Sequence, residues 1–172
     1  MFEALKGFIS GLTEDSRTES GGDADARLAA AALLFHVADL DGVVRPAETA
    51  KLRSLLATRF GLDQSQTSRL IADAVKVDHE AVDLFHFTSV LKRSMEHQDL
   101  LKILEMMWEM AYADGRADEL EENTIWRVAE LLGIESRERI ALRQRIAERA
   151  ASASEDVPAA LEISPWGRPA RS

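Results

Sequence analysis

The chain has 172 residues, of which 46% are hydrophobic and 30% charged, so it can bury one sizeable core and is expected to form a single domain with tails. Its formal net charge of -9, without a clustered run of Lys and Arg, disfavours nucleic acid as a partner. It has no cysteine, which excludes disulfides and thiolate chemistry, and no apolar run of the roughly 20 residues that a membrane-spanning helix needs. We therefore expect a cytoplasmic protein without a transmembrane segment.

The two ends of the chain differ in composition from the middle. Residues 1–13 carry an apolar stripe at helical spacing and predict an amphipathic N-terminal arm, while the polar residues 14–23 predict a flexible linker. Residues 152–172 contain three prolines among small and polar residues and predict a disordered tail. Trp166 in this tail is more simply an exposed residue than an anchor. The helical domain is therefore expected at residues 24–151.

Between these ends, apolar residues recur at steps of three and four almost throughout, which predicts helices and no strands. The fourth helix should be capped by Asp78, the third should begin with a capping box of Asp63 and Gln66, and the second should end at Gly61. The fold class is therefore all-α, a single domain of about seven helices. In chain order we expect them within residues 25–42, 46–60, 63–75, 78–95, 99–115, 118–133 and 136–150.

Two stretches of the chain repeat one another: VADLDGVVRPAE at residues 37–48 and MAYADGRADELE at residues 110–121. Each follows a long apolar helix and leads into another helix with apolar spacing. The repeat has a constant offset of 73 residues, from Asp41 to Asp114, from Gly42 to Gly115 and from Glu48 to Glu121. The chain therefore contains an internal repeat of two helix-Asp-Gly-helix units.

Each repeat resembles part of an EF-hand calcium loop. With Gly42 at the sixth position of such a loop, Asp39 and Asp41 take the third and fifth positions and Glu48 takes the twelfth. Val37 stands where the first carboxylate belongs, and the second repeat lacks both the first and the third ligand. Because calcium needs six to eight oxygens, neither loop alone is expected to bind it tightly.

The repeated acids have two interpretations, and both remain open from the sequence. If the units pack about a pseudo-twofold axis, Asp41, Glu48, Asp114 and Glu121 converge into one cluster, with Asp39 as a further metal ligand. Such a cluster requires a divalent cation (Ca, Mg or Mn) or raised pKa values. Alternatively, the residues only shape helix ends, since Gly permits a left-handed turn, Asp binds local amides and Glu is favoured in a first turn.

Catalytic motifs are not evident. The stretch HEAVDLFH places His79 and His86 seven residues apart, but Asp83 stands where the second histidine of a zinc-protease helix belongs. The sequence also lacks a G-x-S-x-G elbow, a Walker loop and a Rossmann fingerprint. We therefore expect no enzymatic activity.

The long apolar helix ending in ADLDG or AYADG, the Glu six residues after the Gly, and the second such unit resemble the TerB family of tellurite-resistance proteins over residues 24–150. The opening MFEALKGFISGL followed by a polar link is similar to the bacterial stand-alone members. The resemblance implies an all-helical fold of about seven helices, an acidic surface suggested to bind metal, a link to tellurite and other stresses, and no established catalysis. By position, the family's acidic motif is matched by Asp41, Glu48, Asp114 and Glu121.

Two function classes follow from these observations. The first is a non-enzymatic, stress-associated module in which a divalent cation neutralises the acids and rigidifies the two helix junctions. The second is a helical protein–protein interaction domain without metal, in which the acids serve as helix caps. In either case the partners are expected to be proteins, with a homodimer among the options.

Overall fold

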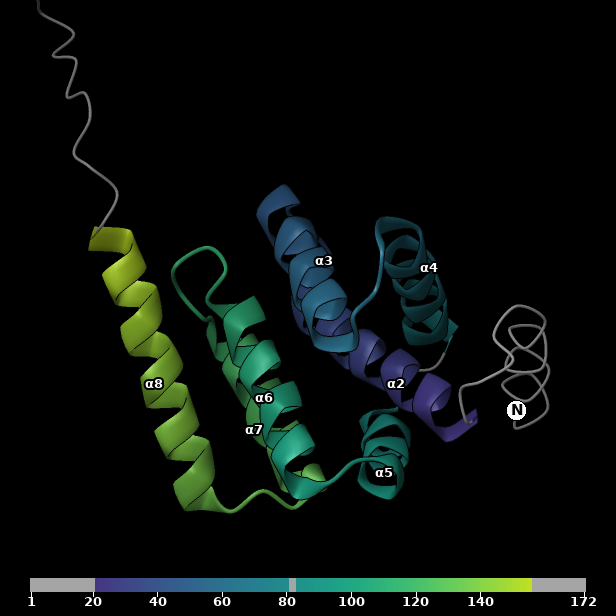
Figure 1. The fold of residues 1–172 in the computed structure, drawn as a ribbon. Coiled ribbons are helices and arrows are strands. Elements are labelled where there is room, and N and C mark those ends of the chain that lie inside the picture. Colours follow the sequence, from purple (N-terminus) through teal and green to yellow (C-terminus); the bar gives the residue numbers. More distant parts are fainter. Residues whose placement is uncertain (1–20, 81–82, 156–172) are drawn as a thin grey trace, which may run out of the picture.

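The computed structural model describes residues 21–80 and 83–155, and within these ranges it contains seven α-helices and no strand (Figure 1). The all-α class and the number of helices agree with the sequence prediction. The predicted N-terminal arm, most of the linker and most of the tail lie outside the described residues. The helices are α2 (Gly21–Ala38), α3 (Pro46–Phe60), α4 (Gln64–Glu80), α5 (Leu84–Ser94), α6 (His97–Ala111), α7 (Glu119–Leu132) and α8 (Ser136–Glu155).

Helix α2 is the central element of the fold. Its successive residues Leu33 and Leu34 are both fully buried, which requires neighbouring helices on more than one side. Those neighbours are α3, α4, α5, α6 and α7, all of which contact α2. The alanines at residues 29–32 are also buried, and their small side chains allow the surrounding helices to approach closely.

A second part of the core joins the C-terminal helices through Trp108 of α6. This side chain is only 1% exposed, and its ring meets the ring of Trp126 of α7 edge-on, with centroids 5.8 Å apart. The guanidinium of Arg143 of α8 lies over the Trp108 ring, 5.6 Å from its centroid. Trp108 therefore ties α7 and α8 to α6, and α8 forms the outer edge of the fold (Figure 1).

The α2–α3 and α6–α7 corners turn at glycines. Gly42 and Gly115 have φ angles of 76° and 97°, in the left-handed region that residues with a side chain rarely adopt. Gly61 and Gly133 end α3 and α7 in the same conformation. Gly61 and Gly133 therefore end their helices as predicted, whereas α2 and α6 end at Ala38 and Ala111, before Gly42 and Gly115 are reached.

The boundary between α4 and α5 differs from the prediction. Helix α4 continues to Glu80, and α5 begins after Asp83, whose Oδ1 accepts a hydrogen bond from the His86 backbone N at 3.2 Å. Asp78, predicted as the cap of this helix, is instead buried within α4, with its Oδ1 3.0 Å from Nδ1 of His36. Both aspartates have the chemistry of an N-cap, and packing of Asp78 against α2 decides between them.

Both ends of the described helical region extend beyond the predicted domain boundaries. Helix α2 begins at Gly21, inside the predicted linker, and α8 continues to Glu155, beyond residue 151. The residues that continue α8 past 151 are Ser152, Ala153, Ser154 and Glu155, which include neither glycine nor proline. Helix α8 therefore continues into a region whose prolines begin only at Pro158.

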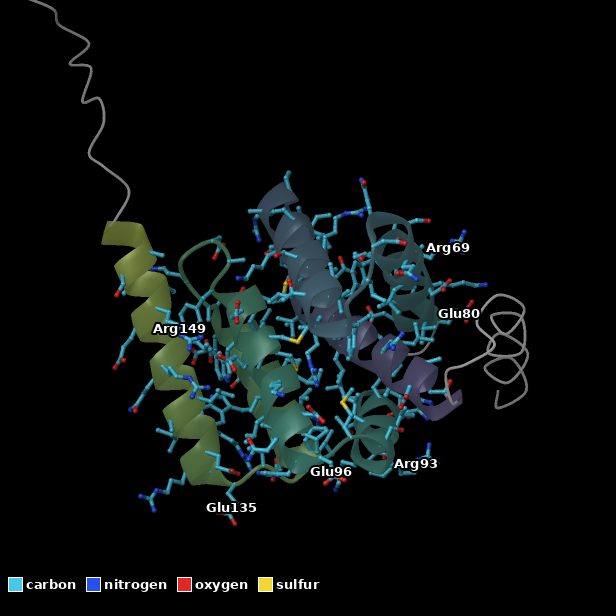
Figure 2. The ribbon with its side chains drawn as sticks, viewed as in Figure 1. Arg69, Glu80, Arg93, Glu96, Glu135 and Arg149 are labelled. Atoms are coloured by element: carbon cyan, nitrogen blue, oxygen red, sulfur yellow. The ribbon has the colours of Figure 1, made fainter. Side chains whose placement is uncertain are left out.

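Charged side chains cover the outside of the helices. Figure 2 labels six such side chains, all exposed: Arg69, Glu80, Arg93, Glu96, Glu135 and Arg149. Within the described ranges, no helix combines the length and the apolar character needed to cross a bilayer.

Candidate functional site

The same local interactions build both helix corners. In the first corner, Oδ1 of Asp41 accepts a hydrogen bond from the backbone N of Val43 at 3.0 Å. In the second, Oδ1 of Asp114 accepts one from the backbone N of Arg116 at 3.3 Å. Each aspartate therefore closes the turn in which it stands.

The two repeated glutamates also make equivalent contacts. Oε2 of Glu48 accepts a hydrogen bond from the backbone N of Arg45 at 2.6 Å, and Oε2 of Glu121 accepts one from the backbone N of Asp118 at 2.8 Å. In both cases the glutamate reaches back to the residue that precedes its helix. The helix-cap interpretation of the repeated acids therefore describes real contacts in both corners.

The two corners also lie against one another, as the pseudo-twofold hypothesis requires. They share a cavity of about 10 Å³, which is about the space needed for one water molecule. The residues that line it are Val37, Ala38, Leu40, Asp41, Arg45 and Glu48 from the first repeat and Asp118 and Glu121 from the second. Three of the four carboxylates of the predicted cluster therefore meet at one place.

The other two predicted metal ligands lie elsewhere. Asp114 lines a neighbouring groove of about 590 Å³, together with Lys51, Glu109 and Tyr112. Asp39 is not among the residues that line the small cavity, and its Oδ2 lies 3.6 Å from Nε2 of His79 on α4. The predicted cluster is therefore less symmetric than the sequence repeat.

Arg45 bridges the two acids of the first corner. Its Nη2 lies 2.8 Å from Oδ2 of Asp41, and its Nη1 lies 3.3 Å from Oε1 of Glu48. The hydrogen bond from the Val43 backbone N, followed by the pairing with Arg45, lowers the pKa of Asp41. Glu48 is only 3% exposed, so Arg45 offsets the charge of a carboxylate that solvent hardly reaches.

Glu121 of the second corner has the opposite electrostatic environment. Burial raises its pKa from 4.5 to about 7; the hydrogen bond from the Asp118 backbone lowers it in part, and the negative charges of Asp118, Asp114 and Glu48 raise it further. Among the described residues, no Lys, Arg or His forms an ion pair with this carboxylate. Within the described residues, the Glu121 carboxylate is therefore not offset by an ion pair.

Comparison with known proteins places this arrangement in a family. The family model described as "Tellurite resistance protein TerB" matches residues 27–144, which is more than half of the chain. The chain belongs to the TerB family. No curated protein and no solved structure gave a match. The matched range includes both corners, so the acidic cavity lies entirely within the TerB domain.

The donor atoms of the TerB cavity suit a hard cation, since Mg²⁺, Ca²⁺ and Mn²⁺ prefer carboxylate oxygens. In their present positions, however, no three Asp, Glu or His side chains of the described residues are arranged to hold one ion. Capping hydrogen bonds occupy one oxygen each of Glu48 and Glu121, and Arg45 occupies another of Glu48. The ligand chemistry of the cavity therefore fits a divalent ion, and binding requires these side chains to reorient.

The sequence predicted Asp118 as the capping-box partner of Glu121, which the structure confirms, but it did not indicate that Asp118 and Arg45 line the TerB cavity. They occupy the same position of the repeat, since Asp118 follows Arg45 by the same offset of 73 residues. The signal was present in the alignment of the two stretches, where a positive residue faces a negative one.

Proposed function

We propose that this TerB-family chain is a non-enzymatic module, associated with resistance to tellurite and other stresses, that binds one divalent cation between its two helix corners. The observation that supports this is the raised pKa of Glu121, about 7, in a cavity that it shares with Glu48, Asp41 and Asp118. A carboxylate in this environment gains stability from either a proton or a nearby cation.

The balance of charge around the cavity supports a cation with more than one positive charge. Four of the lining side chains are carboxylates and one is a guanidinium. Arg45 is shared between Asp41 and Glu48, which leaves Asp118 and Glu121 without a positive partner on the cavity wall. A divalent ion offsets these two charges, whereas a proton on Glu121 offsets one of them.

The lining of the cavity also favours binding over catalysis. Besides the charged groups it consists of the aliphatic side chains of Val37, Ala38 and Leu40. A wall of carboxylates, one guanidinium and methyl groups binds and orients a cation, and it presents no hydroxyl or imidazole nucleophile to a substrate. This is the basis on which we propose a module without enzymatic activity.

A thermal-unfolding experiment on the full chain tests the proposal. The protein is stripped with a chelator and then heated with millimolar Mg²⁺, Ca²⁺ or Mn²⁺; a cation present at about 100 times its dissociation constant adds about 2.7 kcal/mol of stability and raises the melting temperature. Asp41→Asn combined with Asp114→Asn should reduce this increment, and Glu121→Gln should abolish it. Glu119→Gln, an identical change on an exposed side chain in the same helical turn, is the matched control and should keep it.

The alternative function, a protein–protein interaction domain, is favoured by a different observation. Each corner carries an exposed aliphatic side chain, Val43 at 59% and Leu120 at 58% exposure. If none of the three cations raises the melting temperature of the wild-type chain, the metal proposal fails. The capped acids would then be structural, and the corners would be candidates for contact with a partner protein.

A further inference from the structure

Arg45 differs from Asp118, the residue at the equivalent position of the second repeat. An aspartate at position 45 could cap α3, and an arginine cannot. At the equivalent place in the second repeat, Oδ1 of Asp118 accepts a hydrogen bond from the backbone N of Glu121 at 2.9 Å and caps α7. Arg45 occupies the N-cap position of α3, where its side chain makes no cap hydrogen bond, since a guanidinium has no acceptor. Helix α3 therefore lacks the side-chain cap that α7 has.

The guanidinium instead pairs with two carboxylates, which an aspartate could not do. It contacts Asp41 at 2.8 Å and Glu48 at 3.3 Å, so one positive charge joins two carboxylates of the first corner. The Arg45 side chain is 49% exposed, whereas the Glu48 side chain is 4% exposed. Arg45 can therefore rotate into solvent without disturbing the core, and Glu48 cannot.

We infer that Arg45 is an internal counter-ion of the acidic cavity and competes with the divalent cation for the carboxylates of the first corner. This inference rests on the proposed function, and it adds an order of events. The cation is held first by Glu121 and Asp118, which have no positive partner on the cavity wall. Glu48 joins them only when Arg45 has moved away, so Arg45 sets the cation concentration at which the two corners become linked.

Calorimetric titration of the full chain with Mg²⁺ and Mn²⁺ tests this role, using two variants that each remove one positive charge. Arg45→Gln should bind the cation about tenfold more tightly than wild type, because it removes a competing charge within hydrogen-bonding distance of two ligands. Arg116→Gln is the matched control, since Arg116 is exposed in the second corner and forms no ion pair within the described part of the chain. Its affinity should remain within about twofold of wild type.

A second readout does not depend on the cation. In chelator at low ionic strength, Arg45→Gln should lower the melting temperature more than Arg116→Gln, because it leaves the buried Glu48 carboxylate without its positive partner. Arg45→Lys keeps the charge but loses the two-armed bridge, so its affinity should lie between those of wild type and Arg45→Gln. This conservative variant also provides a result if Arg45→Gln does not fold.

The possible outcomes separate this inference from the proposed function. If wild type binds the cation and Arg45→Gln binds it no more tightly, or if Arg116→Gln gains as much, the inference fails and the proposed function stands. If neither wild type nor Arg45→Gln binds, both fail. If only Arg45→Gln binds, Arg45 is the counter-ion that keeps the native cavity closed to cations, and the inference is supported.

Discussion

Replacing Glu121 by glutamine should make the protein more stable at neutral pH. Burial raises the pKa of Glu121 to about 7, so the folded state binds its proton more tightly than the unfolded state does. The folded state is therefore favoured most below pH of about 4.5, where both states are protonated. This advantage is lost as the pH rises to about 7 and the carboxylate must ionise beside Asp118, Asp114 and Glu48. Glutamine removes the ionisation and keeps an oxygen that can accept the hydrogen bond from the Asp118 backbone.

The size of the effect follows from the pKa. A rise from 4.5 to about 7 corresponds to about 3.4 kcal/mol at 1.36 kcal/mol per unit of pKa. Glu121 is only half-buried, and solvent screens its interactions, so we expect about 1–2 kcal/mol of the free energy of unfolding. For a domain of this size, that difference raises the melting temperature of Glu121→Gln by about 3–8 °C at pH 8.

The assay is thermal unfolding of wild type, Glu121→Gln and the control Glu119→Gln between pH 4.5 and 8, with a chelator present so that metal does not contribute. The difference between wild type and Glu121→Gln should be small at pH 4.5 and grow up to about pH 7, while Glu119→Gln stays close to wild type throughout. Titratable groups remote from Glu121 and Glu119 are the same in all three proteins and cancel in this comparison. A constant difference between wild type and Glu121→Gln over the whole range would refute the assigned environment of this carboxylate.

Two further predictions concern the scaffold that holds the site. Gly115→Ala should lower the free energy of unfolding in urea by about 1–2 kcal/mol, because its φ of 97° is strained for alanine although its side chain would meet no atom within 4 Å. Gly22→Ala is the control, within α2 and with ordinary contact at 3.8 Å, and equal costs for the two variants would contradict the role of the left-handed turn. Trp108→Ala should cost about 3–5 kcal/mol in the same experiment, since this side chain is 1% exposed. Half-buried Trp126 should cost less when truncated, and a smaller loss at Trp108 would show that α7 and α8 do not depend on it.

Three helix boundaries were predictable because a residue with special backbone chemistry marks them. Pro46 and Gly61 give both ends of α3, and Gly133 gives the end of α7, because each residue restricts or permits conformations independently of its neighbours. Asp78 shows where this reasoning stops. Its suitability as a cap is a local property, whereas its burial against His36 depends on how α4 packs on α2, which the local pattern does not contain.

The candidate site was predictable only in part. The hypothesis that the two corners pack together indicated a shared neighbourhood for Asp41, Glu48 and Glu121, and these three side chains line one cavity. It could not indicate that Asp114 lines a separate groove, since this depends on how α8 packs beside α6, which the local pattern does not contain. Whether these acids bind a metal stays a prediction.

The asymmetry between the corners changes how the repeat bears on function. Two identical corners would each carry a capped helix and the same surplus of negative charge, and the structure would give no preferred side for a cation. Here Arg45 lowers the charge of the first corner at the expense of a helix cap, while Asp118 caps α7 and adds to the charge around Glu121. Local stability and charge compensation are thus divided between the two halves of the repeat. A cation bound at the shared cavity would consequently act on the second corner first and draw in the first corner only by displacing Arg45.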